Sequence, residues 1–346
     1  MADEIAVVDG EFLSYEEFCA EFMAKNVPVL IKNIGKDWSV FQRWIQSDGR
    51  LDRAYLTQMY GQAQVPVVSY DTSNAYGEED RSTVSLETYM AGLEETPPPK
   101  RYMKDWHFTR DFPNDSIYIT PRFFTDDWLN WWWDRKGGDD YRFVYLGPKG
   151  SFTPLHHDVL QSYSWSINIA GQKEWILFPP SETWKLKNRF GRTPSGSIKT
   201  CDPAEFPHAA SAQRLTIVQD IGTALFVPSG WFHQVTNLTE TLSINHNWFN
   251  AYTLRLIWVF FQQELQAVEH EIAHCRDSFE SVAEWREHCQ LILRANIGMN
   301  YDEFHQLLQS KADELGHGSN ANRRHDAAFA LDEVVEKGFF QAERKL

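Results

Sequence analysis

The sequence has few cysteines, a deficit of positive charge and no long apolar run. Its formal charge of −15 at pH 7 argues against a nucleic-acid binder, which needs a basic surface. No stretch reaches about 18 apolar residues, so neither a transmembrane helix nor another membrane association is expected. The acidic N-terminus has no signal-peptide core, and we expect a cytoplasmic protein, with the nucleus as a further location. The cysteines form no CxxC pair and indicate free thiols in a reducing compartment: Cys19, Cys201, Cys275 and Cys289.

The chain does contain enough apolar residues for a large core. Of its 346 residues, 42% are hydrophobic and 14 are tryptophan, which allows one large domain or two modest ones. The first 100 residues mix helix and strand signals, including the capping-box spacing of Ser14-Tyr-Glu-Glu17. Strands are predicted at 27–32 and 65–70, and helices near 52–60 and 86–93. We therefore expect residues 1–100 to form an α/β portion that packs on the following domain.

Residues 101–250 show mostly strand and turn patterns. Tyr163–Ile169, the turn at Gly171 and Lys173–Phe178 indicate a β-hairpin, and a second turn lies between strands at 223–227 and 231–235. Many short antiparallel strands joined by Gly/Pro turns are typical of a double-sheet barrel. The predicted fold class is therefore mainly β with α, with a double-stranded β-helix (jelly-roll or cupin) core and flanking N-terminal helices.

Residues 251–346 change to a helical pattern. Apolar residues recur at spacings of three to four from Leu254 to Val268, and again from Leu291 to Leu308. Two roles are open for this C-terminal helical region: it could join two copies into a homodimer, or it could cover a sheet edge.

Three residues of the barrel region have the pattern of a metal site. His156 and Asp158 are two positions apart, so on a strand both side chains point to the same face. His233 follows a Pro-Ser-Gly turn about 75 residues later. Two imidazoles and one carboxylate form the facial triad of non-haem Fe(II) sites, which leaves positions open for substrate and O2. A thiolate-rich ligand set would instead favour zinc.

The stretches around these residues resemble a known enzyme family. The strings GPKGSFTPLHHD, GQKEWILFPP and FVPSGWFH, which begin at Gly147, Gly171 and Phe226, are similar in content and order to the JmjC 2-oxoglutarate-dependent oxygenases. The resemblance runs from about Ser14 to Phe249. It implies Fe(II), 2-oxoglutarate as co-substrate and O2, and it implies that the three metal ligands are the catalytic residues.

An oxygenase of this kind needs a cation for the distal carboxylate of 2-oxoglutarate. Lys173 opens the second strand of the predicted hairpin, and the family pattern Gly-x-Lys-x-Trp places its binding lysine there. By resemblance, Thr153, Tyr102 and Asn247 are further co-substrate contacts. Ser166 stands where some relatives carry another asparagine, so the chain departs from the family pattern at that contact.

The likeness extends to a subfamily that hydroxylates a lysine of the eukaryotic translation release factor. It rests on the blocks YMKDWHF, SYSWS and SINHNW, which begin at Tyr102, Ser162 and Ser243. We therefore predict C4 hydroxylation of a lysine in that partner protein, with demethylation of methyl-lysine as the alternative because both reactions use this triad. The residues suited to surround a lysine substrate are Asp105, Trp106, Asp126, Asp127 and 131–133.

Two other classes of protein compete with an oxygenase. His270-Glu-Ile-Ala-His274 matches the HExxH signature of zinc metalloproteases. It lies in a strongly charged helical stretch without a sheet of its own, and a solvated helix face is the better explanation. A non-catalytic binding protein would usually have lost a metal ligand or the binding lysine, and this chain keeps both.

Overall fold

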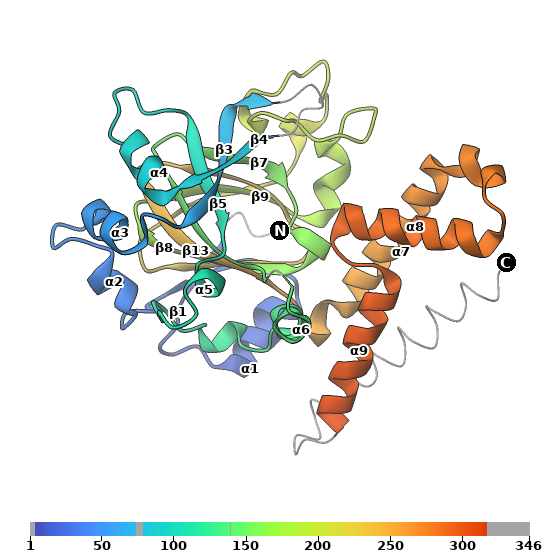
Figure 1. Ribbon diagram of the computed structural model, residues 1–346, viewed down its shortest axis with the longest axis horizontal. Coiled ribbons are helices and arrows are strands. Elements are labelled where there is room, and N and C mark those ends of the chain that lie inside the picture. Colours follow the sequence, from blue (N-terminus) through green and yellow to red (C-terminus); the bar gives the residue numbers. More distant parts are fainter. Residues whose placement is uncertain (1–3, 74–78, 139, 317–346) are drawn as a thin grey trace. The chain divides into compact units, whose positions relative to one another are not determined.

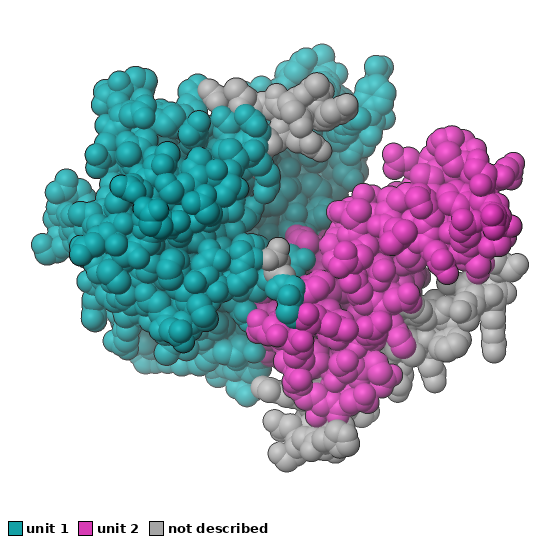
Figure 2. Space-filling model, viewed as in Figure 1, with its two compact units in different colours: residues 1–125, 137–158, 163–248 teal, residues 126–136, 159–162, 249–346 magenta. Residues whose placement is uncertain are grey.

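The computed structural model describes residues 4–73, 79–138 and 140–316. The chain divides into two compact units, shown in teal and magenta in Figure 2. Unit 1 comprises residues 1–125, 137–158 and 163–248, and unit 2 comprises residues 126–136, 159–162 and 249–346. The eight residues predicted to bind metal or co-substrate all belong to unit 1. No helix in the described part of the chain is both long enough and apolar enough to cross a membrane.

The larger sheet of unit 1 has nine strands among the described residues, in the order β1-β2-β11-β8-β13-β6-β5-β3-β4. Neighbouring strands are antiparallel except β1 and β2. The strands are β1 (Ala6–Asp9), β2 (Val29–Lys32), β3 (Gln64–Ser73), β4 (Glu79–Ser85), β5 (Arg101–Trp106), β6 (Arg142–Gly147), β8 (Tyr163–Ala170), β11 (Ala224–Val227) and β13 (Thr241–Trp248).

The smaller sheet is antiparallel and has the order β10-β9-β12-β7. Its strands are β10 (Leu215–Gln219), β9 (Lys173–Phe178), β12 (Phe232–Asn237) and β7 (Phe152–His156). The two sheets face each other, because Leu225 and Val227 of β11 pack in one cluster with Trp175 and Leu177 of β9 (Figure 1). The predicted two-sheet barrel is therefore present.

The alternation along β8 explains why part of the interior of this barrel is polar. All eight residues of β8 are buried, so both of its faces are covered. Tyr163, Trp165 and Ile167 point to the outer face, where they join the main hydrophobic core. Ser164 and Ser166 therefore point to the opposite face, toward the smaller sheet.

The outer face of the larger sheet is covered by the N-terminal segments. Phe18 packs 5.1 Å from Phe226 of β11 and Phe124 lies 5.5 Å from Trp165 of β8, measured between ring centroids. Ser14 forms the predicted capping box with Glu17, and the helix then continues as a π-helix over Cys19–Met23. The short α-helices of unit 1 are α1 (Tyr15–Phe18), α2 (Ser39–Arg43), α3 (Arg53–Tyr60), α4 (Leu86–Gly92) and α5 (Phe108–Asp111).

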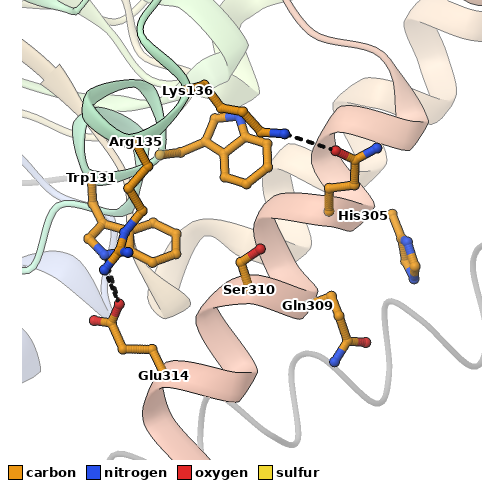
Figure 3. A pocket seen from close by; sticks show the side chains of 9 residues that line it. Trp131, Arg135, Lys136, His305, Gln309, Ser310 and Glu314 are labelled. Carbon is orange, nitrogen blue, oxygen red and sulfur yellow. Dashed lines mark hydrogen bonds and ion pairs between the residues drawn. The ribbon is translucent and has the colours of Figure 1, made fainter.

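Unit 2 contains a helix that the strand pattern of residues 101–250 did not predict. This helix, α6 (Trp128–Lys136), begins where Asp127 accepts a 2.9 Å hydrogen bond from the backbone N–H of Asn130. Figure 3 shows Trp131 and Arg135 of α6 close to Glu314 of α9, to which both donate hydrogen bonds. Asp127 and Trp131 thus have structural roles in unit 2, which differ from the substrate contacts considered for them.

The remaining helices of unit 2 are α7 (Leu254–Glu271), α8 (Val282–Ile297) and α9 (Tyr301–Gly316). Val268 of α7 packs in one cluster with Trp285 and Cys289 of α8. Phe261 of α7 stacks on Phe304 of α9 with ring centroids 4.8 Å apart. These contacts bury one apolar stripe of each amphipathic helix.

Candidate metal centre

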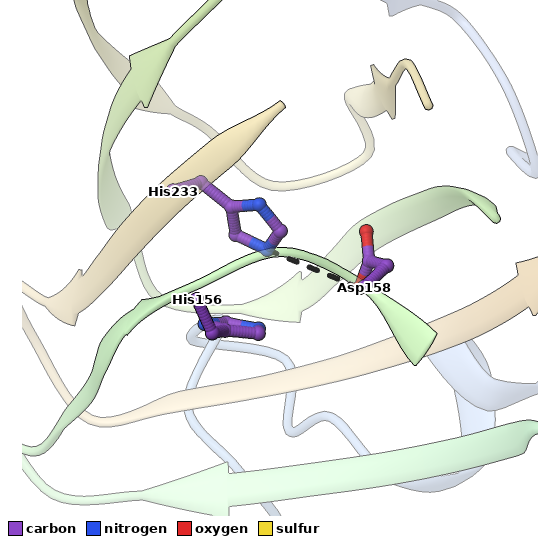
Figure 4. A group of neighbouring side chains, drawn as sticks. All are labelled: His156, Asp158 and His233. Atoms are coloured by element: carbon purple, nitrogen blue, oxygen red, sulfur yellow. Dashed lines mark ion pairs between the residues drawn. The ribbon is translucent and has the colours of Figure 1, made fainter. Parts of the chain in front are cut away.

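The structure brings the three predicted metal ligands together. His156 ends β7 and lies directly opposite His233 of β12, with ring centroids 4.3 Å apart. Asp158 follows two residues later, and its Oδ1 lies 4.0 Å from Nε2 of His233. One ligand atom from each residue lies within 4.8 Å of the others (Figure 4). This is the one group of three or more His, Cys, Asp and Glu residues in the described chain that could hold a metal ion.

Hydrogen bonds orient both imidazoles for coordination. Nδ1 of His156 lies 2.8 Å from the carbonyl oxygen of Pro154, and Nδ1 of His233 lies 3.1 Å from that of Trp231. A carbonyl oxygen only accepts, so each Nδ1 carries the proton and each Nε2 keeps its lone pair. Burial, together with the neighbouring His233, lowers the pKa of His156 to about 3, so this ring is neutral at physiological pH.

Ser164 orients the carboxylate, and the sequence did not single it out. Its hydroxyl donates a 2.7 Å hydrogen bond to Oδ2 of Asp158, which leaves Oδ1 on the side of His233. The signal that could have identified Ser164 is its place on the polar face of β8. Two imidazoles and a carboxylate without a thiolate are a donor set that suits Fe(II), so the residues fit this metal.

A β-bulge brings Thr153 to the same face as the ligands. His156 pairs with His233, whereas Thr153 pairs with Val235, and the register shifts between these two pairs. Side chains three positions apart on a regular strand point to opposite faces, but one extra residue restores the common face. Thr153 is therefore on the barrel interior with His156, as its predicted role requires.

Lys173 lies inside the barrel and bridges the two sheets. Its side chain is 2% exposed, and Nζ donates a 2.6 Å hydrogen bond to Oγ of Ser243 on β13. Burial lowers the pKa of Lys173 to about 7. Leu177 of β9 pairs with the metal ligand His233. Lys173 lies four residues from Leu177 along β9, a strand length of about 13 Å.

Ser243 and Asn245 extend this polar cluster, and the sequence reasoning missed both. Nδ2 of Asn245 donates to the same Ser243 hydroxyl, at 2.9 Å. The detectable signal was the alternation Ser243-x-Asn245-x-Asn247 along β13, which places all three side chains on one face. Asn247, the residue that was predicted, pairs with Ser164 of β8 and so lies near the metal end of this face.

The other predicted co-substrate residues are buried in the same barrel. The ring of Tyr102 is 6.0 Å from that of Tyr145, whose centroid is 5.7 Å from Nζ of Lys173. Ser166 is 2% exposed, and its hydroxyl has no hydrogen-bond partner among the described residues. Oδ1 of Asn237, directly opposite Lys173, also lacks a partner there. Buried polar atoms normally have partners, so this interior suits a polar ligand.

Asp105 is one of the acidic and aromatic residues considered for a lysine substrate, and it lies in unit 1. Its carboxylate accepts a 2.8 Å hydrogen bond from the hydroxyl of Tyr145. It also accepts a 3.1 Å hydrogen bond from Arg81. Trp106 is 1% exposed in the main core, so it cannot contact a substrate.

The HExxH string does not form a metal site. Helix α7 ends at Glu271, and His274 lies in the following 3-10 segment, Ala273–Ser278. The i, i+4 relation that would place His270 and His274 on one helix face is therefore broken. Both histidines are exposed, and Nδ1 of His274 lies 3.0 Å from the carbonyl oxygen of Glu271.

The two-sheet fold and the His-Asp-His cluster define a cupin-type metalloenzyme, and residues 15–253 match the cupin-like domain family. The chain belongs to the JmjC family of 2-oxoglutarate and iron-dependent oxygenases. It is 39% identical over 312 residues to the 2-oxoglutarate and iron-dependent oxygenase JMJD4 of Homo sapiens, covering 87% of this chain and 74% of that protein.

The chain is also similar to an insect and a plant protein. The JMJD4 homolog of Drosophila melanogaster is 36% identical over 361 residues, covering 93% of this chain and 81% of the relative. The arginine-specific demethylase JMJ20 of Arabidopsis thaliana is 35% identical over 323 residues, covering 87% and 68%. The predicted fold class, enzyme class and cofactors are thereby confirmed: this is an oxygenase that uses Fe(II), 2-oxoglutarate and O2.

Proposed function

We propose that this chain hydroxylates a lysine side chain of the eukaryotic translation release factor, in the cytoplasm. The observation that carries the oxygenase chemistry is the cluster of His156, Asp158 and His233 in one barrel with the buried Lys173. The choice of substrate is supported by the sequence blocks shared with release-factor hydroxylases. A cationic target also suits a chain of charge −15.

In this proposal His156, Asp158 and His233 would hold Fe(II). With 2-oxoglutarate and O2, the metal would supply the oxidant that converts a C–H bond to an alcohol while 2-oxoglutarate becomes succinate and CO2. Ser164 holds the Asp158 carboxylate in one orientation. The residues of the polar interior then position the co-substrate and shield it from water.

Lys173 in its protonated form binds the distal carboxylate of 2-oxoglutarate. A buried ammonium that meets a carboxylate gains a charge-assisted hydrogen bond, which offsets the cost of its burial. Thr153 and Tyr102 share this interior and add hydroxyl groups for the same carboxylate. In this proposal Asn247 and Ser166, on neighbouring strands, contact the rest of the co-substrate.

Demethylation is the second candidate, and one finding favours it. The Arabidopsis relative is named an arginine-specific demethylase, and a relative from Caenorhabditis briggsae, 27% identical over 278 residues, is named a bifunctional arginine demethylase and lysyl-hydroxylase. Hydroxylation of an N-methyl carbon followed by loss of formaldehyde would use the same metal ligands.

Mass spectrometry separates the two reactions. The purified chain with Fe(II), ascorbate and 2-oxoglutarate is expected to add one oxygen atom to a lysine of release-factor peptides. The Asp158→Ala variant, treated identically, provides the control. Loss of a methylene mass from methylated lysine or arginine peptides, with unmodified release-factor peptides unchanged, would contradict the proposal and favour demethylation.

A further inference from the structure

Residues 180–214 form a long segment that leaves and rejoins the smaller sheet beside the metal centre. Phe178, at the end of β9, pairs with Phe232, which precedes the ligand His233. On its return the chain enters β10 at Leu215, which pairs with Leu177, the residue opposite His233. Both ends of the segment are therefore fixed at the metal end of this sheet.

Apolar side chains of this segment anchor it on the outer face of the smaller sheet. They pack against Leu155, Ile176 and Phe232. The anchoring residues are Leu186, Ile198, Phe206, Ala209 and Ala212. The segment is thus a fixed part of unit 1 and can present other side chains in defined positions.

Asn188 fixes a tight turn at residues 188–192. Its backbone N–H donates to the carbonyl oxygen of Arg192 and its carbonyl oxygen accepts from the N–H of Gly191, both at 2.9 Å. Its side-chain Oδ1 accepts from the N–H groups of Phe190 and Arg192, both at 3.0 Å, while Nδ2 donates to Glu205 at 2.8 Å. Gly191 supplies the left-handed backbone, with φ of 77°.

Phe190 at the tip of this turn is 70% exposed, with the guanidinium of Arg189 4.6 Å from its ring centroid. The turn is held by Asn188 and Gly191, so nothing in its geometry requires an aromatic side chain at that position. Trp184 of the same segment is also 60% exposed. Exposed aromatic residues beside arginine are enriched in the cores of protein interfaces.

The charge of this segment is opposite to that of the whole chain. Residues 180–214 contain six lysines and arginines against three acidic residues, a formal charge of +3 in a chain of −15. Lys185 and Lys199 are paired with Glu182 and Glu174. In contrast, the side chains of Lys187, Arg192 and Arg214 are exposed and have no hydrogen-bond or ion-pair partner among the described residues.

We propose that residues 180–214 are a docking surface for an acidic segment of the protein substrate, with Phe190 and Arg192 at its centre. This inference rests on the proposed function, in that it requires a protein substrate. Three unpaired cations suit a short acidic peptide. A nucleic acid carries many phosphates, which the surrounding negative charge would repel.

Binding of a fluorescent octaglutamate peptide tests the surface independently of catalysis. The double variant Phe190→Ala/Arg192→Glu removes the aromatic and reverses one charge while keeping Asn188 and Gly191. We expect its Kd for the peptide to rise about tenfold at low salt relative to the unaltered chain. A matched control, Phe12→Ala/Arg255→Glu, makes the same changes at exposed residues outside the segment and should leave Kd unchanged.

Equal affinity of the double variant and the control would overturn the proposal, as would tighter binding of single-stranded RNA than of octaglutamate. The failure of the proposed function is detected separately. If the unaltered chain binds octaglutamate through Phe190 and Arg192 but adds no oxygen to the release factor, the docking surface stands and the substrate is a different protein. If hydroxylation proceeds and octaglutamate binding does not depend on these residues, the docking surface alone is wrong.

Discussion

At the scale of single residues, the proposed role of Lys173 predicts that its protonation controls co-substrate binding. The free enzyme holds this lysine with a pKa of about 7 because it is buried, without an ion-pair partner among the described residues. A bound 2-oxoglutarate carboxylate favours the charged form, so binding above pH 7 requires uptake of a proton. The affinity for 2-oxoglutarate is then full below pH 7 and falls as pH rises through and above 7, by up to about tenfold per pH unit.

Calorimetric titration of 2-oxoglutarate with Mn(II) in place of Fe(II) measures this slope between about pH 6 and pH 9. An arginine remains protonated throughout that range, so Lys173→Arg is expected to show a flatter profile, whatever its absolute affinity. Identical slopes in both proteins would mean that another group titrates.

Ser164 is expected to contribute to metal affinity through Asp158. Ser164→Ala removes the 2.7 Å hydrogen bond that orients the carboxylate, and loss of such a partner typically weakens metal binding about 10- to 100-fold. Metal titration with Co(II) measures the change. Ser166→Ala is a matched control, since Ser166 lies on the same face of β8 but does not donate a hydrogen bond to Asp158, and it should leave metal affinity unaltered. Equal affinities of the two variants would remove Ser164 from the metal centre.

At the scale of secondary structure elements, the turn between β8 and β9 fixes the position of Lys173. Gly171 in this turn has a φ of 75°, and a Cβ there would lie 2.1 Å from the backbone oxygen of Glu240. Gly171→Ala is therefore expected to lower the free energy of unfolding by about 3 kcal/mol. Gly196 is the control, because a Cβ added there meets no atom within 4 Å. Gly196→Ala should change the free energy of unfolding by less than about 0.5 kcal/mol. Urea unfolding measures the free energy of unfolding of both variants. A similar loss of stability at Gly171 and Gly196 would contradict this account.

Elements defined by local patterns could be predicted from the sequence. The strands expected at 163–169 and 173–178 are present as β8 and β9, but the expected hairpin is wrong, because β8 lies in the larger sheet and β9 in the smaller one. The sequence placed His156 and Asp158 on one strand, whereas β7 ends at His156 and Asp158 lies two residues beyond it. The bulge that turns Thr153 inward was not predictable, because it depends on the register with β12. The same is true of Ser164, whose partner Asp158 lies beyond the end of β7.

At the scale of the whole molecule, the grouping of unit 2 could not be read from local patterns. It joins residues 126–136 with residues after 249, through contacts such as those of Trp131 and Arg135 with Glu314. Partners so far apart in the chain leave no periodic signal in either segment. The tryptophan run of α6 was considered for a substrate site with packing as the alternative, and Trp131 of this run donates a hydrogen bond to Glu314 of α9.

The central claim is that the chain is an oxygenase whose iron is held by His156, Asp158 and His233. The most direct test measures bound Fe(II) and the succinate formed from 2-oxoglutarate in the presence of peptide substrate. The unaltered chain is predicted to bind about one Fe(II) and to form succinate, whereas Asp158→Ala, with an intact fold, is predicted to lose both. Full succinate formation by Asp158→Ala would contradict the account.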